Sequence, residues 1–298
     1  MYMVDKIESE KDVLYNSYSN TVSIDDIINA NLDGLENIKA EFFTNIVHEL
    51  RTPVNIILGA IQLLNMDIND EINLSKLKKK DYYNSIKQNS FRLIKMINDI
   101  LDLSKIESGY YNLNFGNYNI ISIVEDIVSS VANYIEDQSI CLIFDTNVEE
   151  KIIACDPEKI ERIMLNLISN SVKFTKPGGL VEVIIKDRKD SVIVIVRDTG
   201  CGIQKDDLKD IFNRFTQVGK PSSKGMDGSG IGLSLVKSLV ELHKGTIKAK
   251  SVYGKGTVMI IELPVIKTEN SRNFTPCNKN LNKDITERLN IEFSYNTK

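Results

Sequence analysis

Two long stripes of apolar residues in the first third of the chain constrain its fold most strongly. From Ile24 to Leu64, apolar positions recur at steps of three, four and seven residues, and a second stripe covers residues 86–103. This spacing is typical of amphipathic α-helices. Joined by the polar stretch 65–80, the two helices would form an antiparallel hairpin that cannot enclose a core alone. We therefore expect pairing with a second copy into a four-helix bundle, and hence a homodimer.

After Gly109, which we expect to end the second helix, short β-branched runs alternate with helical patterns. The runs lie at 140–146, 180–186, 191–198 and 256–264, and the helical patterns at 120–137, 157–173 and 231–243. This alternation predicts an α+β fold with helices covering one face of a sheet. The final stretch 287–296 fits either a short strand or a helical turn. The expected domains are a linker and the start of a signalling helix (1–35), a helical hairpin (36–108), an α/β sandwich (109–265) and a polar C-terminal tail (266–298).

Composition limits the partners and the compartment. A net charge of -4 provides no basic surface for nucleic acid. No run of 18 apolar residues occurs, so we expect no membrane span. Four scattered cysteines without a C-x-x-C pair suit a reducing cytosol, and with only two histidines a zinc site is not expected. We expect a cytoplasmic chain, which could also be a fragment of a membrane-anchored parent.

A helix predicted to start at Asp156-Pro157 carries a polar face. Asp can cap a helix N-terminus, and proline suits the first helical position. Asn166, Asn170 and Lys173 then recur at steps of four and three, which places them on one side of the helix. Two amides and an ammonium there can hold Mg²⁺ and phosphate oxygens. A solvated polar face would have the same pattern, so the pattern alone leaves both readings open.

Two glycine-containing turns follow. The apolar run 192–196 ends at Asp198, followed by Gly200 and Gly202, and such a turn lets the backbone approach a ligand closely. The second turn, 225–233, is rich in glycine and opens a helix, where exposed N–H groups and the helix dipole favour an anion. It lacks the context of a dinucleotide fingerprint and the ending of a P-loop. An ordinary Asp/Gly turn and a plain linker remain the alternatives.

His48 lies within the first stripe, next to Glu49 and five residues before Pro53. A lone helical histidine is usually structural, but here a carboxylate stands beside it as a potential base. Pro53 also removes the N–H that would bond the Glu49 carbonyl, so a bend is expected in the helix. These neighbours favour a nucleophilic histidine.

Taken together, five motifs resemble the sensor histidine kinases that have a HisKA-type dimerisation domain. They are the H box, N box, G1 box, F box and G2 box, which in this sequence are residues 48–53, 166–174, 198–203, 211–215 and 228–233. All five occur in the family's order and spacing, over roughly residues 36–264. Each motif is weak to moderate alone, but their joint order is very specific.

The resemblance implies a Bergerat-type ATP-binding fold and an ATP- and Mg²⁺-dependent kinase that phosphorylates His48 and passes the phosphoryl group to an aspartate of a response regulator receiver domain. It also implies phosphatase activity toward the regulator. Glu49 would be the acid/base partner of His48, and Thr52 would help to hydrolyse the phosphorylated regulator. ATP would be bound by Asn166, Asn170, Lys173, Phe174, Asp198, Gly200, Gly202, Arg214, Gly228, Gly230, Gly232 and Leu233, with Asn166 and Asn170 positioning the metal.

Departures from the family pattern are small and remove no catalytic group: Ser171 stands where alanine is common, Val47 where serine is frequent, and Lys244 where glycine is usual. Two rival functions remain. One is a nucleotide-binding dimeric scaffold without catalysis, against which the intact His48, Glu49 and Asn170 argue. The other is an ATPase that drives conformational change, against which the H-box hairpin argues. The second histidine, His243, is expected to be structural.

Overall fold

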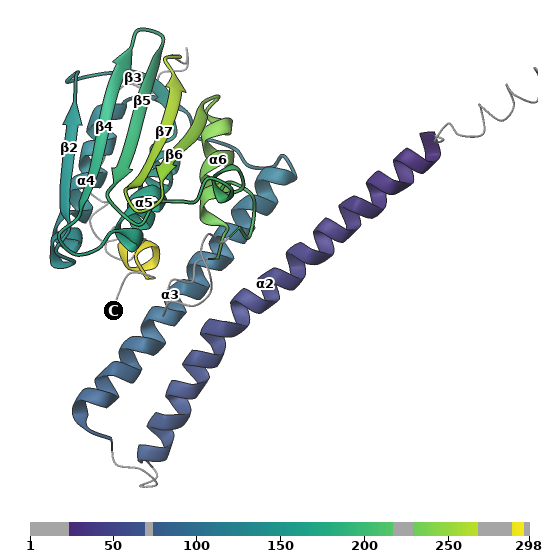
Figure 1. Ribbon diagram of the computed structural model, residues 1–298, viewed down its shortest axis with the longest axis vertical. Helices are drawn as coiled ribbons and strands as arrows, with labels where there is room; N and C mark the ends of the chain where they lie inside the picture. The colour runs from purple at the N-terminus through teal and green to yellow at the C-terminus, as the bar shows by residue number, and fades with distance from the viewer. Residues whose placement is uncertain (1–23, 69–73, 217–228, 268–287, 295–298) are drawn as a thin grey trace, which may run out of the picture. The chain divides into compact units, whose positions relative to one another are not determined.

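A computed structural model describes residues 24–68, 74–216, 229–267 and 288–294, with side chains described from Phe43 onward (Figure 1). The chain divides into two compact units, and the division falls within one helix, between Glu49 and Leu50. Among the helices of the described ranges, none has an apolar stretch long enough to cross a bilayer.

The two predicted stripes form the long helices α2 (Ile24–Ile68) and α3 (Lys76–Glu107). Both extend into the stretch 65–80, so the expected connection is too long at each end. Polar residues on an exposed helix side do not stop a helix, whereas the Ser75 side chain accepts a hydrogen bond from the Lys78 N–H and so begins α3. Helix α2 continues through Pro53.

Gly109 ends α3, as predicted. Its φ of 72° is in the left-handed region, which glycine adopts without a steric penalty. The Gly109 N–H donates to the Ile106 carbonyl, and the Tyr110 N–H donates to the Lys105 carbonyl. This pair of bonds is a Schellman motif, which satisfies carbonyls at the helix end and turns the chain toward the sheet domain.

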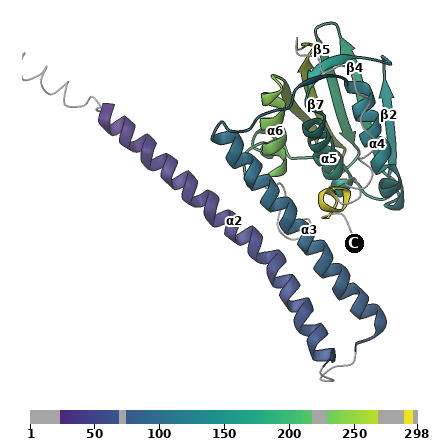
Figure 2. The ribbon, with the colours of Figure 1, turned by 180° about the vertical axis from the view of Figure 1, so that it is seen from behind.

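The second half of the chain is a five-stranded sheet with helices on one face, as Figures 1 and 2 show from opposite sides. The strand order is β2-β4-β5-β7-β6; β2 and β4 are parallel and the other pairs antiparallel. The strands are β2 (Cys141–Thr146), β4 (Leu180–Arg188), β5 (Ser191–Asp198), β6 (Thr246–Val252) and β7 (Gly256–Pro264), and the helices are α4 (Ile120–Asp137), α5 (Pro157–Phe174) and α6 (Gly232–Leu242). A 3₁₀ turn, η1 (Asp207–Lys209), follows β5. The predicted α+β class is confirmed.

Three strands were not predicted from the sequence. β1 (Gly116–Asn119) and β3 (Ile152–Cys155) pair as a separate two-stranded sheet, and at four residues each they are too short for a clear alternation. β6 lies at the sheet edge and carries Lys248 and Lys250 among its residues. Charged edge strands discourage pairing with other chains, and their apolar signal is correspondingly weak.

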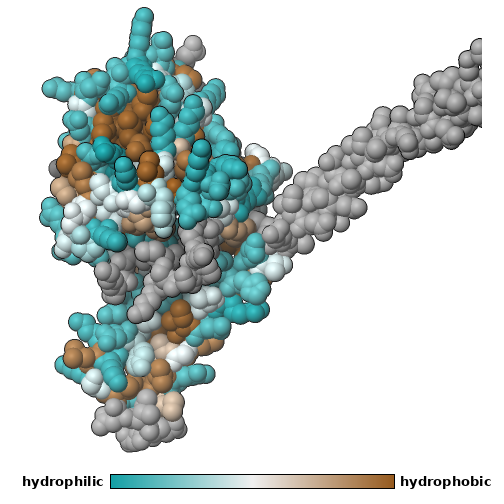
Figure 3. Space-filling view, in the orientation of Figure 1, coloured by the Kyte–Doolittle hydropathy of each residue, from teal (hydrophilic) through white to brown (hydrophobic). Residues whose placement is uncertain are grey.

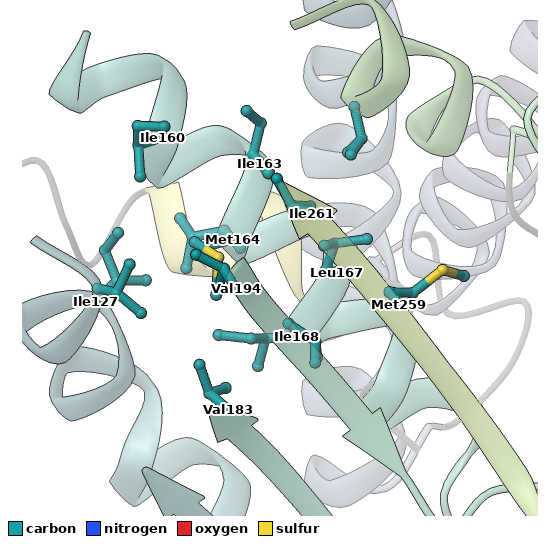
Figure 4. Packing of buried hydrophobic residues seen from close by; sticks show 14 of the residues in the cluster. Ile127, Ile160, Ile163, Met164, Leu167, Ile168, Val183, Val194, Met259 and Ile261 are labelled. Atoms are coloured by element: carbon teal, nitrogen blue, oxygen red, sulfur yellow. The ribbon is translucent and has the colours of Figure 1, made fainter. Parts of the chain in front are cut away.

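The core lies between the sheet and the three helices. Side chains alternate along β4, so that Val181, Val183 and Ile185 are fully buried while their neighbours are not. Figure 4 shows Val183 and Val194 from the strands, Ile127 from α4, and Met164 and Ile168 from α5 converging in this layer. Burial of such side chains stabilises the fold by about 1.5–3 kcal/mol each.

The opposite face of the sheet is partly apolar. Ile184, Ile195 and Ile260 occupy one register row across β4, β5 and β7, and each is partly exposed. Brown side chains gather over these strands in Figure 3. One face of the sheet is therefore packed against helices and the other is partly accessible to solvent.

The chain forms a last helical turn at 288–292, followed by Phe293 and Ser294. This resolves the ambiguity of the final stretch in favour of helix. Phe293 is only 1% exposed and belongs to the main core, with its ring 4.6 Å from that of Tyr134 between centroids. Part of the segment expected to be a polar tail is thus integrated into the domain.

Candidate functional site

Helix α5 presents the predicted polar face to a cavity. Asp156 caps the helix by accepting hydrogen bonds from the N–H groups of Glu158 (3.1 Å) and Lys159 (3.4 Å). Asn166 is 4% exposed, and its Oδ1 accepts a hydrogen bond of 3.0 Å from Asn170 Nδ2. The cavity lies beside this amide pair, so the face is a wall of a site and not a solvated surface.

Asp198, at the end of β5, is buried and held by backbone donors. Its Oδ1 accepts hydrogen bonds from the Gly200 N–H at 2.8 Å and the Thr257 N–H at 3.2 Å. Burial raises the pKa of Asp198, although these two N–H groups and the Ser171 hydroxyl favour the ionised form. The residue is therefore a fixed acceptor at the cavity.

Glycines allow close backbone approach around the cavity. A Cβ on Gly232 would lie 2.5 Å from Asn166 Nδ2, and a Cβ on Gly202 would lie 2.2 Å from the Val252 carbonyl oxygen. Gly202 and Gly230 also have positive φ values of 67° and 64°. Helix α6 begins at Gly232 beside the cavity, and its N-cap, Ile231, makes no side-chain capping hydrogen bond. Its first N–H groups thus suit an anionic ligand.

The cavity brings together most of the residues predicted to bind nucleotide. Those that line it are Asn166, Asn170, Lys173, Phe174, Asp198, Gly202, Gly230, Gly232 and Leu233. Gly200 stands directly behind Asp198, where a Cβ would lie 2.6 Å from the Phe174 carbonyl oxygen. The Lys173 ammonium lies 5.0 Å from the centre of the Phe174 ring. Gly228 lies outside the described residues.

Arg214 is placed differently from the other predicted residues. It does not line the cavity, and its guanidinium forms an ion pair with Glu107 at the end of α3. Both side chains are partly exposed, and such pairs contribute little to stability. Arg214 is therefore the predicted ATP-binding residue that pairs with α3 and not with the cavity.

Several cavity residues were not predicted. Ile203, Ile211 and Met259 supply apolar walls, and Thr257 supplies the second backbone donor to Asp198. Ser171, noted in the sequence only as a departure from alanine, also lines the cavity, and its hydroxyl favours the ionised form of Asp198, which lowers the pKa of that carboxyl. Lys95 of α3 and Glu292 of the C-terminal turn also border the cavity. No local sequence signal connects residues so distant in the chain.

His48 and Glu49 lie on α2, where His48 is exposed and Glu49 half-buried. Arg51 and Thr52, farther along the same helix, are exposed. Exposure suits His48 for reaction with a group delivered by another domain. The second histidine is structural, as predicted: His243 is buried, and its Nε2 accepts a 3.2 Å hydrogen bond from the Asp156 N–H.

The polar residues of the cavity fit a magnesium-bound phosphate. Within the described ranges, no cluster of three or more His, Cys, Asp or Glu side chains could hold a metal alone. The Asn166–Asn170 pair supplies amide oxygens, which Mg²⁺ accepts as one or two ligands alongside water and phosphate. Asn170 donates through its nitrogen, so its oxygen is the atom suited to the cation.

Comparisons with known proteins agree with this geometry. Residues 38–109 match the family described as "His Kinase A (phospho-acceptor) domain", and residues 155–267 match "Histidine kinase-, DNA gyrase B-, and HSP90-like ATPase". Two solved structures share the fold: histidine kinase ThkA in complex with response regulator protein TrrA (TM-score 0.60, 22% identity, 78% of this chain and 64% of that chain) and full-length ShkA in complex with AMPPNP (0.56, 24%, 76% and 46%).

Relatives with higher sequence identity indicate the family of this chain. The "Non-motile and phage-resistance protein" of Caulobacter vibrioides is 38% identical over 76% of this chain, and "Hybrid signal transduction histidine kinase D" of Dictyostelium discoideum is 36% identical over 78%. "Autoinducer 2 sensor kinase/phosphatase LuxQ" of Vibrio vulnificus is 35% identical over 80%. The chain spans only 27%, 15% and 28% of these three relatives. By these matches, the chain belongs to the sensor histidine kinase family.

Proposed function

We propose that this chain is an ATP-dependent protein histidine kinase that phosphorylates its own His48 and passes the phosphoryl group to an aspartate of a response regulator. The observation that carries the proposal is that one chain matches both a phospho-acceptor family and an ATPase family. The phospho-acceptor match contains His48, and the ATPase match contains the cavity residues Asn166, Asn170 and Asp198. A scaffold or a plain ATPase would not need both.

ATP would bind with its adenine at Asp198 and its phosphates at the start of α6. The Asp198 Oδ1 is already engaged by two backbone N–H groups, which leaves Oδ2 to accept from the exocyclic amine. Gly230 and Gly232 let the backbone approach the phosphates, and Lys173 adds a positive charge. Mg²⁺, when bound, would neutralise charge on the phosphates. Asn166 and Asn170 would hold and orient that metal.

The chemistry at His48 is phosphoryl transfer. A ring nitrogen of His48 would attack the γ-phosphorus, a P–N bond would form, and the bond from phosphorus to the oxygen bridging to ADP would break. Glu49 would accept the proton of the other ring nitrogen as the imidazole gains positive charge. Most of the acceleration would come from positioning and charge stabilisation, as in other phosphoryl transfers.

The phosphoryl group would then move from His48 to a receiver aspartate. A fold relative crystallised with its response regulator supports this partner class. Phosphatase activity toward the regulator is supported by the kinase/phosphatase relative. Thr52 follows His48 by four residues, and its exposed hydroxyl could orient a water toward the phospho-aspartate. We also propose a homodimer as the active form.

The test is incubation of the full chain with γ-labelled ATP and Mg²⁺, followed by acid or alkali treatment. We expect label that is lost in acid, stable in alkali and absent from His48→Gln. Glu49→Gln should slow labelling about 10²–10⁴-fold, the usual size of general-base assistance. Thr52→Ala should keep labelling and lose phosphatase activity toward a cognate regulator. Acid-stable label, or label that persists in His48→Gln, would overturn the proposal.

A further inference from the structure

The C-terminal turn, residues 288–294, lies between α3 and the sheet domain. In Figure 1 it is the yellow helix next to α5 and α3. Its anchor is apolar: Phe293 is buried in the core, and the Tyr134 hydroxyl of α4 donates a 3.5 Å hydrogen bond to the Phe293 carbonyl. A buried phenyl group in well-packed surroundings fixes a segment firmly. The turn is therefore a docked element of the domain.

Polar contacts connect the same turn to both neighbouring helices. On the α3 side, Lys95 forms an ion pair with Glu292, and Arg92 Nε donates a 3.2 Å hydrogen bond to the Ser294 carbonyl. On the α5 side, Arg288 pairs with Glu161 at 2.7 Å. The turn thus holds helix α3 and helix α5 together through its own charges.

The Lys95–Glu292 pair is shielded from solvent, with side-chain exposures of 9% and 11%. Breaking a shielded pair leaves an uncompensated charge, which is costly unless another counter-charge arrives. α5 also reaches α3 directly, because Arg162 pairs with both Asp99 and Asp102. Asp99 Oδ2 has no hydrogen-bond partner within the described part of the chain. Burial raises the pKa of Asp99, and the positive charge of Lys95 counteracts this effect, so the charge balance of this contact depends on Lys95.

Lys95 and Glu292 also border the nucleotide cavity, together with Asn166 and Asn170. A bound triphosphate brings several negative charges to this cavity. It would repel the Glu292 carboxylate and attract the Lys95 ammonium, so the phosphate and Glu292 compete for the same cation. Binding of nucleotide and docking of the C-terminal turn therefore disfavour each other electrostatically.

We propose that residues 288–294 form a C-terminal clasp, which fastens the sheet domain to α3 and restrains autophosphorylation, and that bound nucleotide weakens this restraint by drawing Lys95 away from Glu292. The restraint rests on the proposed kinase function, because transfer requires reacting atoms about 3–3.5 Å apart. Transfer from ATP brings the sheet domain to His48, whereas transfer to a receiver aspartate brings the receiver domain there instead. The sheet domain therefore needs more than one position during the reaction cycle, and the clasp stabilises the position in which this domain is fastened to α3.

Coupling between nucleotide and clasp is tested first by binding, without any use of catalysis. We expect Glu292→Gln, and the chain ended after residue 287, to bind Mg-AMPPNP at least about fivefold more tightly in calorimetry, the lower end of usual coupling between sites. The matched control is Glu125→Gln, an exposed residue of α4 with the same loss of charge. The shortened chain also loses the core residue Phe293 and could fold poorly for that reason. Glu292→Gln keeps Phe293, so the test remains valid in that case. Unchanged or weaker binding in folded Glu292→Gln overturns the coupling.

Coupling is reciprocal, so nucleotide must loosen the clasp. Hydrogen exchange at 289–294 in the full chain should become faster when Mg-AMPPNP is added, and greater protection would overturn the proposal. Because coupling of this size weakens the clasp without abolishing it, the restraint persists at saturating ATP, and initial rates of labelling measured there should rise in Glu292→Gln. A rate equal to that of the full chain would refute the restraint. Absence of label in every chain would refute the kinase function instead, while binding and exchange would still decide the coupling.

Discussion

Asp198 has divided roles for its two carboxylate oxygens. Oδ1 accepts from Gly200 and Thr257, so Oδ2 is the oxygen suited to a ligand amine. Asp198→Asn would keep the oxygen for the two backbone donors and turn an NH₂ group toward that amine. Because a hydrogen bond to a charged group contributes about 1.5–3 kcal/mol, ATP affinity should fall about ten- to a hundredfold.

Calorimetric titration with Mg-ATP measures this loss. Burial raises the pKa of Asp198, so its ionised form is disfavoured in the fold, and the neutral amide should not lower the melting temperature. Asp190→Asn, an exposed change just before β5, is the control and should bind normally. Unchanged affinity in folded Asp198→Asn would place the adenine elsewhere.

His243 is held as a neutral imidazole. Its Nδ1 lies 2.8 Å from the Leu239 carbonyl and must donate, while Nε2 accepts from the Asp156 N–H. A proton on Nε2 would face that N–H and is therefore disfavoured. Burial lowers the pKa of His243 below its usual value, although the Leu239 carbonyl and the Asp156 carboxylate act to raise it. The unfolded chain therefore binds more protons below about pH 6.5, so stability is complete above that pH and declines as the pH falls.

Urea denaturation at pH 7.5 and 5.5 measures this decline. His243→Gln should lower stability at pH 7.5, because Gln cannot reproduce both hydrogen bonds, and should reduce the difference between the two pH values. His48→Gln removes the other histidine of the chain, keeps both hydrogen bonds of His243, and serves as the control that should keep the decline. An equal decline in His243→Gln would assign the pH dependence to other groups.

At the scale of elements, the N-terminus of α5 positions much of the nucleotide cavity. Asp156 Oδ1 caps the helix, and Oδ2 accepts a 2.8 Å hydrogen bond from the Asn114 N–H. Loss of an N-cap costs about 0.5–2 kcal/mol, and loss of the partly buried bond to Asn114 adds about 1 kcal/mol. Asp156→Ala should lower the melting temperature by several degrees. Asp206→Ala, at a 3₁₀ turn whose cap makes no side-chain hydrogen bond, should not.

Long elements were predictable because their patterns repeat. The stripes of α2 and α3 and the apolar runs of β4, β5 and β7 extend over enough residues to define a period. Short strands such as β1 and β3 depend on tertiary pairing, which local sequence does not encode. Likewise, the family motifs located the cavity, but the partners of Arg214 and Glu292 on α3 come from contacts between distant segments.

At the scale of the whole molecule, the helical hairpin has exposed apolar side chains that the described chain does not cover. Leu58 on α2 and Leu101 on α3 are 52% and 51% exposed. Five further large apolar side chains of the two helices are also exposed: Val54, Ile56, Ile61, Ile94 and Ile97. Exposed apolar surface of this extent on neighbouring elements marks an interaction site. A second hairpin would cover it in a four-helix bundle.

We therefore expect a homodimer, which light scattering at micromolar concentration should report as twice the chain mass. Full burial of a leucine contributes about 1.5–3 kcal/mol, and a buried unpaired carboxylate costs more. The double variant Leu58→Glu/Leu101→Glu should thus scatter as a monomer at the same concentration. Its dimer would bury four carboxylates, two from each chain. Tyr110→Glu changes a side chain that is 81% exposed just beyond α3, so it should remain dimeric. A monomeric parent chain with folded helices would refute the bundle, and a dimeric double variant would place the interface on another surface.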